Sequence, residues 1–151
     1  MIKGYLAGPL FTEMEREFNA LLAKKLRSIT DKNGDPIFKI FLPQDASAPL
    51  IGQEGWQRKV FQLNVGEVVG SNFLIANLNG ATSDDGTCFE VGLGYGNSIP
   101  IIGYRDDFRQ AGPEGLVNLM LGESASAMCQ NLPEIYQALR TIFHLKFEDP
   151  V

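Results

Sequence analysis

The chain has 151 residues, of which 44% are hydrophobic and 21% charged, a composition that is ordinary for one globular domain over residues 1–151. Its formal net charge of −5 and pI near 4.8 argue against a nucleic-acid-binding protein, and no apolar run is long enough to cross a membrane. The two cysteines, Cys88 and Cys129, form no disulfide or metal-binding pattern, so we expect a reduced, cytoplasmic protein.

The first half of the chain alternates strands and helices. "IKGYLA" (2–7) is a short apolar run that ends at Gly8-Pro9, which predicts a buried strand. Apolar residues at helical spacing predict a helix over 13–29, and "IFKIF" (37–41) predicts the second strand. The loop 42–54 is longer than a minimal connection, and such loops often line binding sites.

The middle of the chain repeats this pattern. A helix is predicted over 54–70, with an apolar stripe formed by Phe61, Val65, Val68 and Val69. Asn64 borders that stripe, so its polar side chain needs a partner. "NFLIANL" (72–78) is an apolar run suited to a central parallel strand.

The remaining elements complete an α/β pattern. Residues 87–97 are predicted to be a helix, although three glycines weaken it, and "SIPIIGY" (98–104) predicts a fourth strand. Residues 126–129 are a candidate fifth strand, and the last helix begins after Asn131 as its cap. We therefore expect a single flavodoxin-like domain: a mostly parallel five-stranded sheet with helices on both faces.

The single histidine, His144, limits the possible chemistry. Ser-His-Asp and Cys-His sites and most zinc sites require a histidine. His144 lies near the C-terminus in a segment with the pattern of an amphipathic helix, and we expect it to be a helix-face residue without a role. The sequence predicts carboxylate chemistry and no metal site.

In a parallel sheet of this kind, ligands bind at the carboxyl ends of the strands. The loops expected to form the site are those at 8–13, 42–54, 79–87 and 104–120.

Glu90 is the first candidate in these segments, and its pattern has two interpretations. Thr87-x-x-Glu90 matches a capping box, in which the two side chains only close a helix N-terminus. Alternatively, Glu90 follows the predicted central strand, where a carboxylate points into the crevice and acts chemically. "GLGYG" (92–96) lacks the G-x-G-x-x-G spacing, so close helix–sheet packing at Gly92 and Gly96 is favoured over a dinucleotide site.

Several motifs occur together in the order of a known family. They are "GYLAGPLF", "FLPQD", "SNFLIANLNG", "DDGTCFEVGLGYG" followed by "PII", and "VNLML", and they span about residues 1–121. With these motifs the sequence resembles the nucleoside 2-deoxyribosyltransferase family. The glycine-threonine-glutamate turn alone is only moderately specific, but its combination with "YLAGP" and "NLM" is strong.

The resemblance implies a double displacement without a cofactor. Glu90 would attack the anomeric carbon of a 2'-deoxyribonucleoside and form a covalent deoxyribosyl-enzyme, which a free nucleobase then resolves. Asp84 would protonate the leaving base and deprotonate the incoming one. Tyr5 would orient Glu90 by a hydrogen bond; its alternative is a strand-end tyrosine packed on a loop.

The resemblance also implies substrate contacts. Gly8, Pro9 and Phe11 would line the base pocket, although Phe11 suits a core aromatic almost equally well. Asn118 would reach the sugar 5'-hydroxyl of a neighbouring subunit, which requires a homodimer or a higher homo-oligomer; from the residues alone it is a turn or cap. The other expected substrate-binding residues are Met120, Gln44, Asp45 and Asn64.

The chain departs from the family pattern at three asparagines. Asn64 stands where some members carry a base-contacting aspartate, and Asn77 and Asn79 replace acids common in the family's turn. An amide both donates and accepts, so the base preference is expected to differ.

Two rival functions remain. A hydrolase would let water resolve the intermediate, and related enzymes that cleave 2'-deoxynucleoside 5'-monophosphates need phosphate donors, for which Arg105 and Arg109 are the candidates. A non-catalytic nucleotide-binding module would have no use for a reactive carboxylate. Replacing Glu90 with alanine distinguishes a binding module from an enzyme, because an enzyme loses turnover whereas a binding module keeps its ligand affinity.

Overall fold

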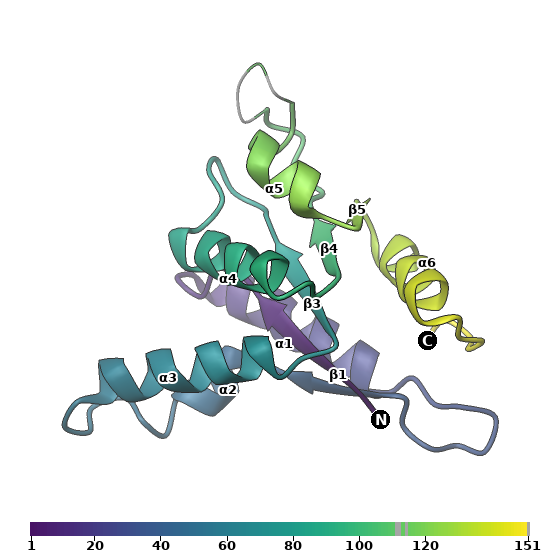
Figure 1. Cartoon of the computed structure of the whole chain (residues 1–151), viewed down its shortest axis with the longest axis horizontal. Coiled ribbons are helices and arrows are strands. Elements are labelled where there is room, and N and C mark those ends of the chain that lie inside the picture. The colour runs from purple at the N-terminus through teal and green to yellow at the C-terminus, as the bar shows by residue number, and fades with distance from the viewer. Residues whose placement is uncertain (111–112, 114, 151) are drawn as a thin grey trace.

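The computed structural model describes residues 1–110, 113 and 115–150; residues 111, 112 and 114, in the loop expected at 104–120, and residue 151 lie outside this description. Within it, five strands form one parallel sheet in the order β2-β1-β3-β4-β5 (Figure 1). The strands are β1 (Ile2–Ala7), β2 (Phe38–Phe41), β3 (Phe73–Asn77), β4 (Ile101–Tyr104) and β5 (Ala127–Cys129). This is the flavodoxin-like order, so the predicted fold is confirmed, with a sheet that is parallel in every pairing of these strands.

Six helices lie in the described part of the chain. They are α1 (Glu13–Arg27), α2 (Pro43–Ser47), α3 (Trp56–Val69), α4 (Asp85–Gly96), α5 (Leu119–Ser124) and α6 (Leu132–Phe143). Helices α2 and α5 fall in segments expected to be loops, because five or six residues are too few to show a helical period. The expectation for His144 is wrong: it ends α6 as the C-cap, with a left-handed φ of 52°.

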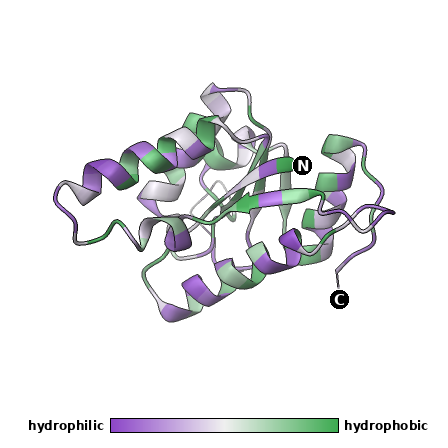
Figure 2. Ribbon diagram, turned by 90° about the horizontal axis from the view of Figure 1, so that it is seen from below, coloured by the Kyte–Doolittle hydropathy of each residue, from purple (hydrophilic) through white to green (hydrophobic). Residues whose placement is uncertain are grey.

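The helices cover the two faces of the sheet. Helices α1 and α6 pack on one face around Leu6 of β1, and α3, α4 and α5 pack on the other around Tyr5 and Ala7. This alternation follows from the two-residue period of a strand. In Figure 2 the helices carry hydrophobic and hydrophilic bands side by side, as expected of helices that bury one face.

Two packing expectations for the helices are wrong. Gly92 and Gly96 have open space where a Cβ would stand, whereas a Cβ on Gly94 would contact Leu74 at 3.6 Å, so Gly94 is the glycine packed on the sheet. On α3 only Val68 is fully buried, and Phe61 and Val69 are 46% and 48% exposed. Helix α3 packs against α4, and the Phe61 and Phe89 rings of the two helices lie 5.9 Å apart.

Strand β1 pairs with β2 on one side and with β3 on the other, so the strand order along the sheet reverses at β1. Ligands bind outside the carboxyl ends of the strands at such a switch point. Tyr5 and the Gly8–Pro9 turn lie at the end of β1, and α4 follows β3 at the same edge. The fold therefore brings the candidate residues of three segments together.

Candidate active site

The centre of the candidate site is a hydrogen bond between the buried Tyr5 side chain and the half-buried Glu90 side chain. The Tyr5 hydroxyl donates to Glu90 Oε1, which joins β1 to α4 across 85 positions of sequence. Tyr5 is 1% exposed, and its ring stacks on Phe41 with the centroids 5.4 Å apart. The Glu90 carboxylate is thus held in one orientation by a group that favours its ionised form.

Asp84 begins the helix that carries Glu90. Its Oδ2 accepts from the Thr87 backbone N–H and from the Thr87 hydroxyl, both at 2.8 Å, so Asp84 is the N-cap and α4 starts at Asp85. The capping-box interpretation is wrong, because Thr87 lies inside the helix and Glu90 bonds Tyr5 instead. Of the three residues expected to be catalytic, Asp84 therefore caps α4, Glu90 lies in its second turn, and Tyr5 on β1 bonds Glu90.

Burial is the main influence on the Glu90 carboxyl. It raises the pKa of Glu90 to about 7, against the opposing effect of the Tyr5 hydrogen bond and with a smaller contribution from the Asp84 charge. The pKa of Tyr5 is raised far above its ordinary value, first by burial and then by the negative charge of Glu90. Near neutral pH the pair therefore consists of a neutral phenol and a carboxyl close to its midpoint.

A cavity of about 300 Å³ lies beside Glu90, between α3 and α4. Asn64 lines this cavity, and its Oδ1 is buried without a hydrogen-bond partner among the described residues. The predicted partner of Asn64 is thus not supplied by this chain, and a buried acceptor of this kind is satisfied by a donor on a ligand or by water. The lining residues are Phe61, Asn64, Val65, Val68, Gly86, Phe89, Glu90 and Leu93.

A larger cavity, of about 640 Å³, lies on the other side of α4, between α4 and α5. Asn118 and Met120 line it, and neither lines the Glu90 cavity. Asn118 is the N-cap of α5 and accepts from the Met120 backbone N–H at 2.9 Å, while Met120 is 74% exposed. We take the smaller cavity as the candidate reaction site because it is the one that Glu90 lines.

The turn after β1 lies at the same edge of the sheet. The Pro9 carbonyl accepts from Asn19 Nδ2 at 3.0 Å, and Gly8 packs against Asn19 and Asn77. Phe11 is 76% exposed, so the alternative of a core aromatic is wrong, and it does not line the Glu90 cavity.

The two residues expected on the 42–54 loop lie on α2. Gln44 donates to the Arg16 carbonyl at 3.1 Å, and its Oε1 is buried without a partner among the described residues. Asp45 lies 4.0 Å from Arg27 and lines a separate cavity with Lys3 and Arg27. Neither residue lines the Glu90 cavity.

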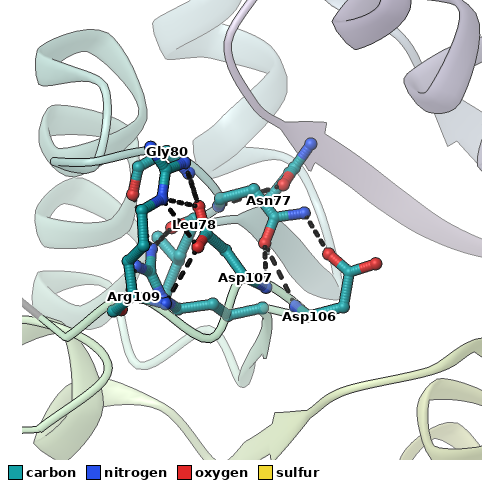
Figure 3. Close-up of polar contacts among 8 residues, drawn as sticks. Asn77, Leu78, Gly80, Asp106, Asp107 and Arg109 are labelled. Carbon is teal, nitrogen blue, oxygen red and sulfur yellow. Dashed lines mark hydrogen bonds and ion pairs between the residues drawn. The ribbon is translucent and has the colours of Figure 1, made fainter.

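Polar contacts join the loops after β3 and β4 (Figure 3). Arg105 is 2% exposed and donates to the carbonyls of Leu78, Gly80 and Arg109. Asn79 donates to Asp106 at 2.6 Å and accepts from the backbone N–H groups of Asp106 and Asp107. Arg109 is paired with Asp107, which lowers the pKa of Asp107 well below its usual range. The loop that leads to α4 is thus anchored by hydrogen bonds.

Three buried polar residues near this edge, Asn19, Thr87 and Arg105, were absent from the predicted site. Asn19 had a signal, because it falls on the helical stripe of Leu22 and Leu26, where a polar side chain needs a partner. Thr87 was interpreted as a cap, and Arg105 only as a candidate phosphate ligand of the rival hydrolase. The contacts that bury them come from distant segments.

Two findings on the described residues bear on other kinds of site. Within residues 1–110, 113 and 115–150, no three His, Cys, Asp or Glu side chains are grouped so that they could hold a metal ion. No helix in this part of the chain has the length and apolar character needed to cross a bilayer.

The chain is similar to several known proteins. A family model described as nucleoside 2-deoxyribosyltransferase matches residues 4–138. A conserved protein from Enterococcus faecalis V583 is 25% identical, with a TM-score of 0.73 over 96% of this chain and 99% of that one. No curated protein matches the chain.

Two solved deoxyribosyltransferases share the fold. The 2-deoxyribosyltransferase of Bacillus psychrosaccharolyticus is 21% identical, with a TM-score of 0.67 over 88% of this chain and 89% of that one. The 2-desoxiribosyltransferase of Leishmania mexicana is 19% identical, with a TM-score of 0.64 over 96% and 100%.

Proposed function

Because the chain belongs to the nucleoside 2-deoxyribosyltransferase family, we propose that it transfers a 2-deoxyribosyl group from a 2'-deoxyribonucleoside to a free nucleobase. The observation that carries the proposal is the half-buried Glu90 carboxylate, oriented by the Tyr5 hydroxyl beside a cavity between α3 and α4. Such an exchange would serve nucleoside salvage, and a cytoplasmic location stays a prediction from the sequence.

In the first step, Glu90 Oε attacks the anomeric carbon while the bond from that carbon to the base breaks. The electron pair of this bond goes to the base nitrogen, which takes a proton from Asp84. The transition state has oxocarbenium character, so a fixed anion beside the sugar lowers its energy. Asp84 is suited to this role because both of its capping bonds use Oδ2.

In the second step, a nitrogen of the incoming base attacks the same carbon and Glu90 leaves as a carboxylate. Asp84 accepts the proton of the incoming base and returns to its starting form, so atoms and charges balance over the cycle. Two displacements at one carbon retain its configuration. No cofactor is required.

The contacts to the nucleobase are assigned first. We assign base contacts to Asn64, whose unpartnered Oδ1 accepts an N–H of the base. The family resemblance adds the Gly8–Pro9 turn, which lies at the same edge of the sheet but does not line the Glu90 cavity. Phe11, Gln44 and Asp45 do not line the Glu90 cavity, so a role for them requires movement of their segments.

Asn118 and Met120 support a composite site. In one chain they line the cavity between α4 and α5 and not the Glu90 cavity, so a role in binding the sugar would place them at the Glu90 cavity of a neighbouring copy. We therefore propose a homodimer or a higher homo-oligomer in which Asn118 binds the sugar 5'-hydroxyl of the adjacent site.

Hydrolysis of 2'-deoxynucleoside 5'-monophosphates is the weaker alternative. Arg105 is occupied by three backbone carbonyls and Arg109 by Asp107, so both candidate phosphate ligands already have partners. A sugar with a free 5'-hydroxyl needs neither of them.

Base exchange tests the proposal directly. The protein is incubated with 2'-deoxyinosine or 2'-deoxyuridine, with and without free adenine, and the products are separated by chromatography. We expect deoxyadenosine from at least one donor and much slower donor loss without adenine, and no product from Glu90→Ala. Equal donor loss with and without adenine would identify a hydrolase, and ligand binding without turnover would identify a binding module.

A further inference from the structure

Two asparagine side chains are buried behind the turn that follows β1. Asn19, on α1, is 1% exposed, and Asn77, the last residue of β3, is 3% exposed. Burying an amide costs free energy unless its donor and acceptor are both bonded. These two amides are bonded to each other and to the backbone on either side.

The bonds form a chain with one direction. Asn79 N–H donates to Asn77 Oδ1 at 3.2 Å, and Asn77 Nδ2 donates to Asn19 Oδ1 at 3.2 Å. Asn19 Nδ2 then donates to the Pro9 carbonyl at 3.0 Å. A backbone N–H only donates and a carbonyl only accepts, so the two ends fix which way both amides point. We call these two side chains the amide relay.

The turn fits against the amide relay. A Cβ on Gly8 would lie 3.0 Å from Asn77 Cβ and 3.1 Å from Asn19 Oδ1, so a larger residue there would require these two side chains to shift by a few tenths of an ångström. Three residues earlier on the same strand, Tyr5 holds Glu90 on the opposite face of the sheet. The position of the turn relative to Glu90 is therefore set by β1 and by the amide relay together.

We propose that Asn19 and Asn77 are positioning residues that hold the Gly8–Pro9 turn where it receives the nucleobase. The inference rests on the proposed function, in which this turn contacts the nucleobase. The amide relay needs a hydrogen-bond donor at position 77. In Asn77→Asp an ionised carboxylate only accepts, so Asn19 has to turn its Nδ2 toward that carboxylate. Asn19 Oδ1 then faces the Pro9 carbonyl, two acceptors oppose each other, and the turn is released.

Asn77→Asp has a pH signature that a packing defect lacks. When the introduced carboxyl is protonated, its O–H donates to Asn19 Oδ1 and its other oxygen accepts from Asn79, so the relay is restored. The charged groups that border the same cavity are Glu15 on α1 and Asp106, Asp107 and Arg109 after β4. They are present in both proteins, so their titration cancels when the variant is compared with the wild type at each pH.

The test is calorimetric binding of adenine, hypoxanthine, thymine and cytosine to the full chain at pH 8 and pH 5. For the base that the wild type binds most tightly, Asn77→Asp should bind about tenfold more weakly at pH 8, the loss expected for one misplaced hydrogen bond. At pH 5 the affinity should return to within about twofold of the wild type. Asn33→Asp, the same change at an exposed asparagine in the loop before β2, should match the wild type at both values of pH.

Asn19→Leu is the second variant, because leucine keeps the volume and removes both bonds. It should weaken base binding at pH 8 and pH 5 alike, with no recovery in acid. The proposal is overturned if folded Asn77→Asp or Asn19→Leu binds the base as the wild type does at pH 8, or if the Asn77→Asp deficit is the same at both values of pH. Failure of the proposed function looks different, because the wild type then forms no deoxyadenosine in the exchange assay, whatever its affinity for the free bases.

Discussion

Removing the Tyr5 hydroxyl should shift the pH dependence of the reaction upward. Tyr5→Phe keeps the ring that stacks on Phe41 and deletes only the donor to Glu90. That bond lowers the pKa of Glu90, which burial holds at about 7, so its loss raises the pKa further. A hydrogen bond to a charged group contributes about 1.5–3 kcal/mol, and 1.36 kcal/mol corresponds to one pH unit, so the acidic limb should move up by about one to two pH units.

The size of the defect then depends on pH. At pH 7 the ionised fraction of Glu90 falls from about one half to between about 1% and 10%, so kcat/KM for base exchange should drop roughly 5- to 50-fold. At pH 9.5 most of the activity should return. The assay is a pH–rate profile for both proteins between pH 5 and 10, with thermal melts to show that the variant is folded.

Asp84→Asn provides a control of opposite sign. The Asp84 charge raises the pKa of Glu90, and asparagine keeps the cap of α4, so this variant should lower the titration midpoint of Glu90. Its own loss of proton transfer reduces the rate, so the midpoint is read from the NMR titration of the Glu90 carboxyl carbon. An acidic limb that stays in place or moves down in Tyr5→Phe would refute the assignment of Tyr5 as the group that favours the Glu90 carboxylate.

Three further predictions concern stability. Glu90→Gln should abolish exchange yet stabilise the fold at pH 8. The folded-state pKa of Glu90 lies above its unfolded value, so ionisation of Glu90 lowers the stability of the wild type by up to about 3 kcal/mol above pH 7. In denaturant unfolding, the extra stability of the variant should vanish as the pH falls toward 4.5. Arg105→Met should cost about 2–4 kcal/mol, because three backbone carbonyls lose their donor. Arg109→Met at the surface should destabilise the fold much less, and equal losses of stability would contradict the anchoring role of Arg105. Gly4→Ala should cost about 1–3 kcal/mol in urea, because its Cβ would stand 2.3 Å from the buried Phe73 ring, while Gly66→Ala, in open space on α3, should gain about 0.5–1 kcal/mol.

The fold was predictable because its signals are local and repeated. Each strand of the sheet is a short apolar run between turn residues, and the alternation with helices implies the parallel sheet that the structure shows. Two helices were not predicted, because α2 and α5 are shorter than two turns and show no helical period. Helix α2 begins at Pro43, and α5 begins after the Asn118 cap.

The site was predictable only in part, since its residues meet through contacts between distant segments. Glu90 was ambiguous in the sequence because a capping box and a nucleophile use the same residue spacing, and only the contact with Tyr5 separates them. Asn64 was identified because a polar residue interrupts an apolar stripe. Asn19 likewise lies on the apolar stripe of its helix, and that position alone indicates a buried polar side chain. The backbone acceptors of Arg105 cannot be predicted from a single sequence.

The Tyr5–Glu90 bond also has a consequence for folding. It joins positions that are 85 residues apart, through β1, which lies between β2 and β3 in the sheet. In an unfolded or nascent chain Glu90 is an ordinary hydrated glutamate with neither burial nor an orienting hydroxyl. The proposed nucleophile is therefore a product of cooperative folding, and loss of exchange activity during denaturation should coincide with the collapse of the central sheet rather than with fraying at the chain ends.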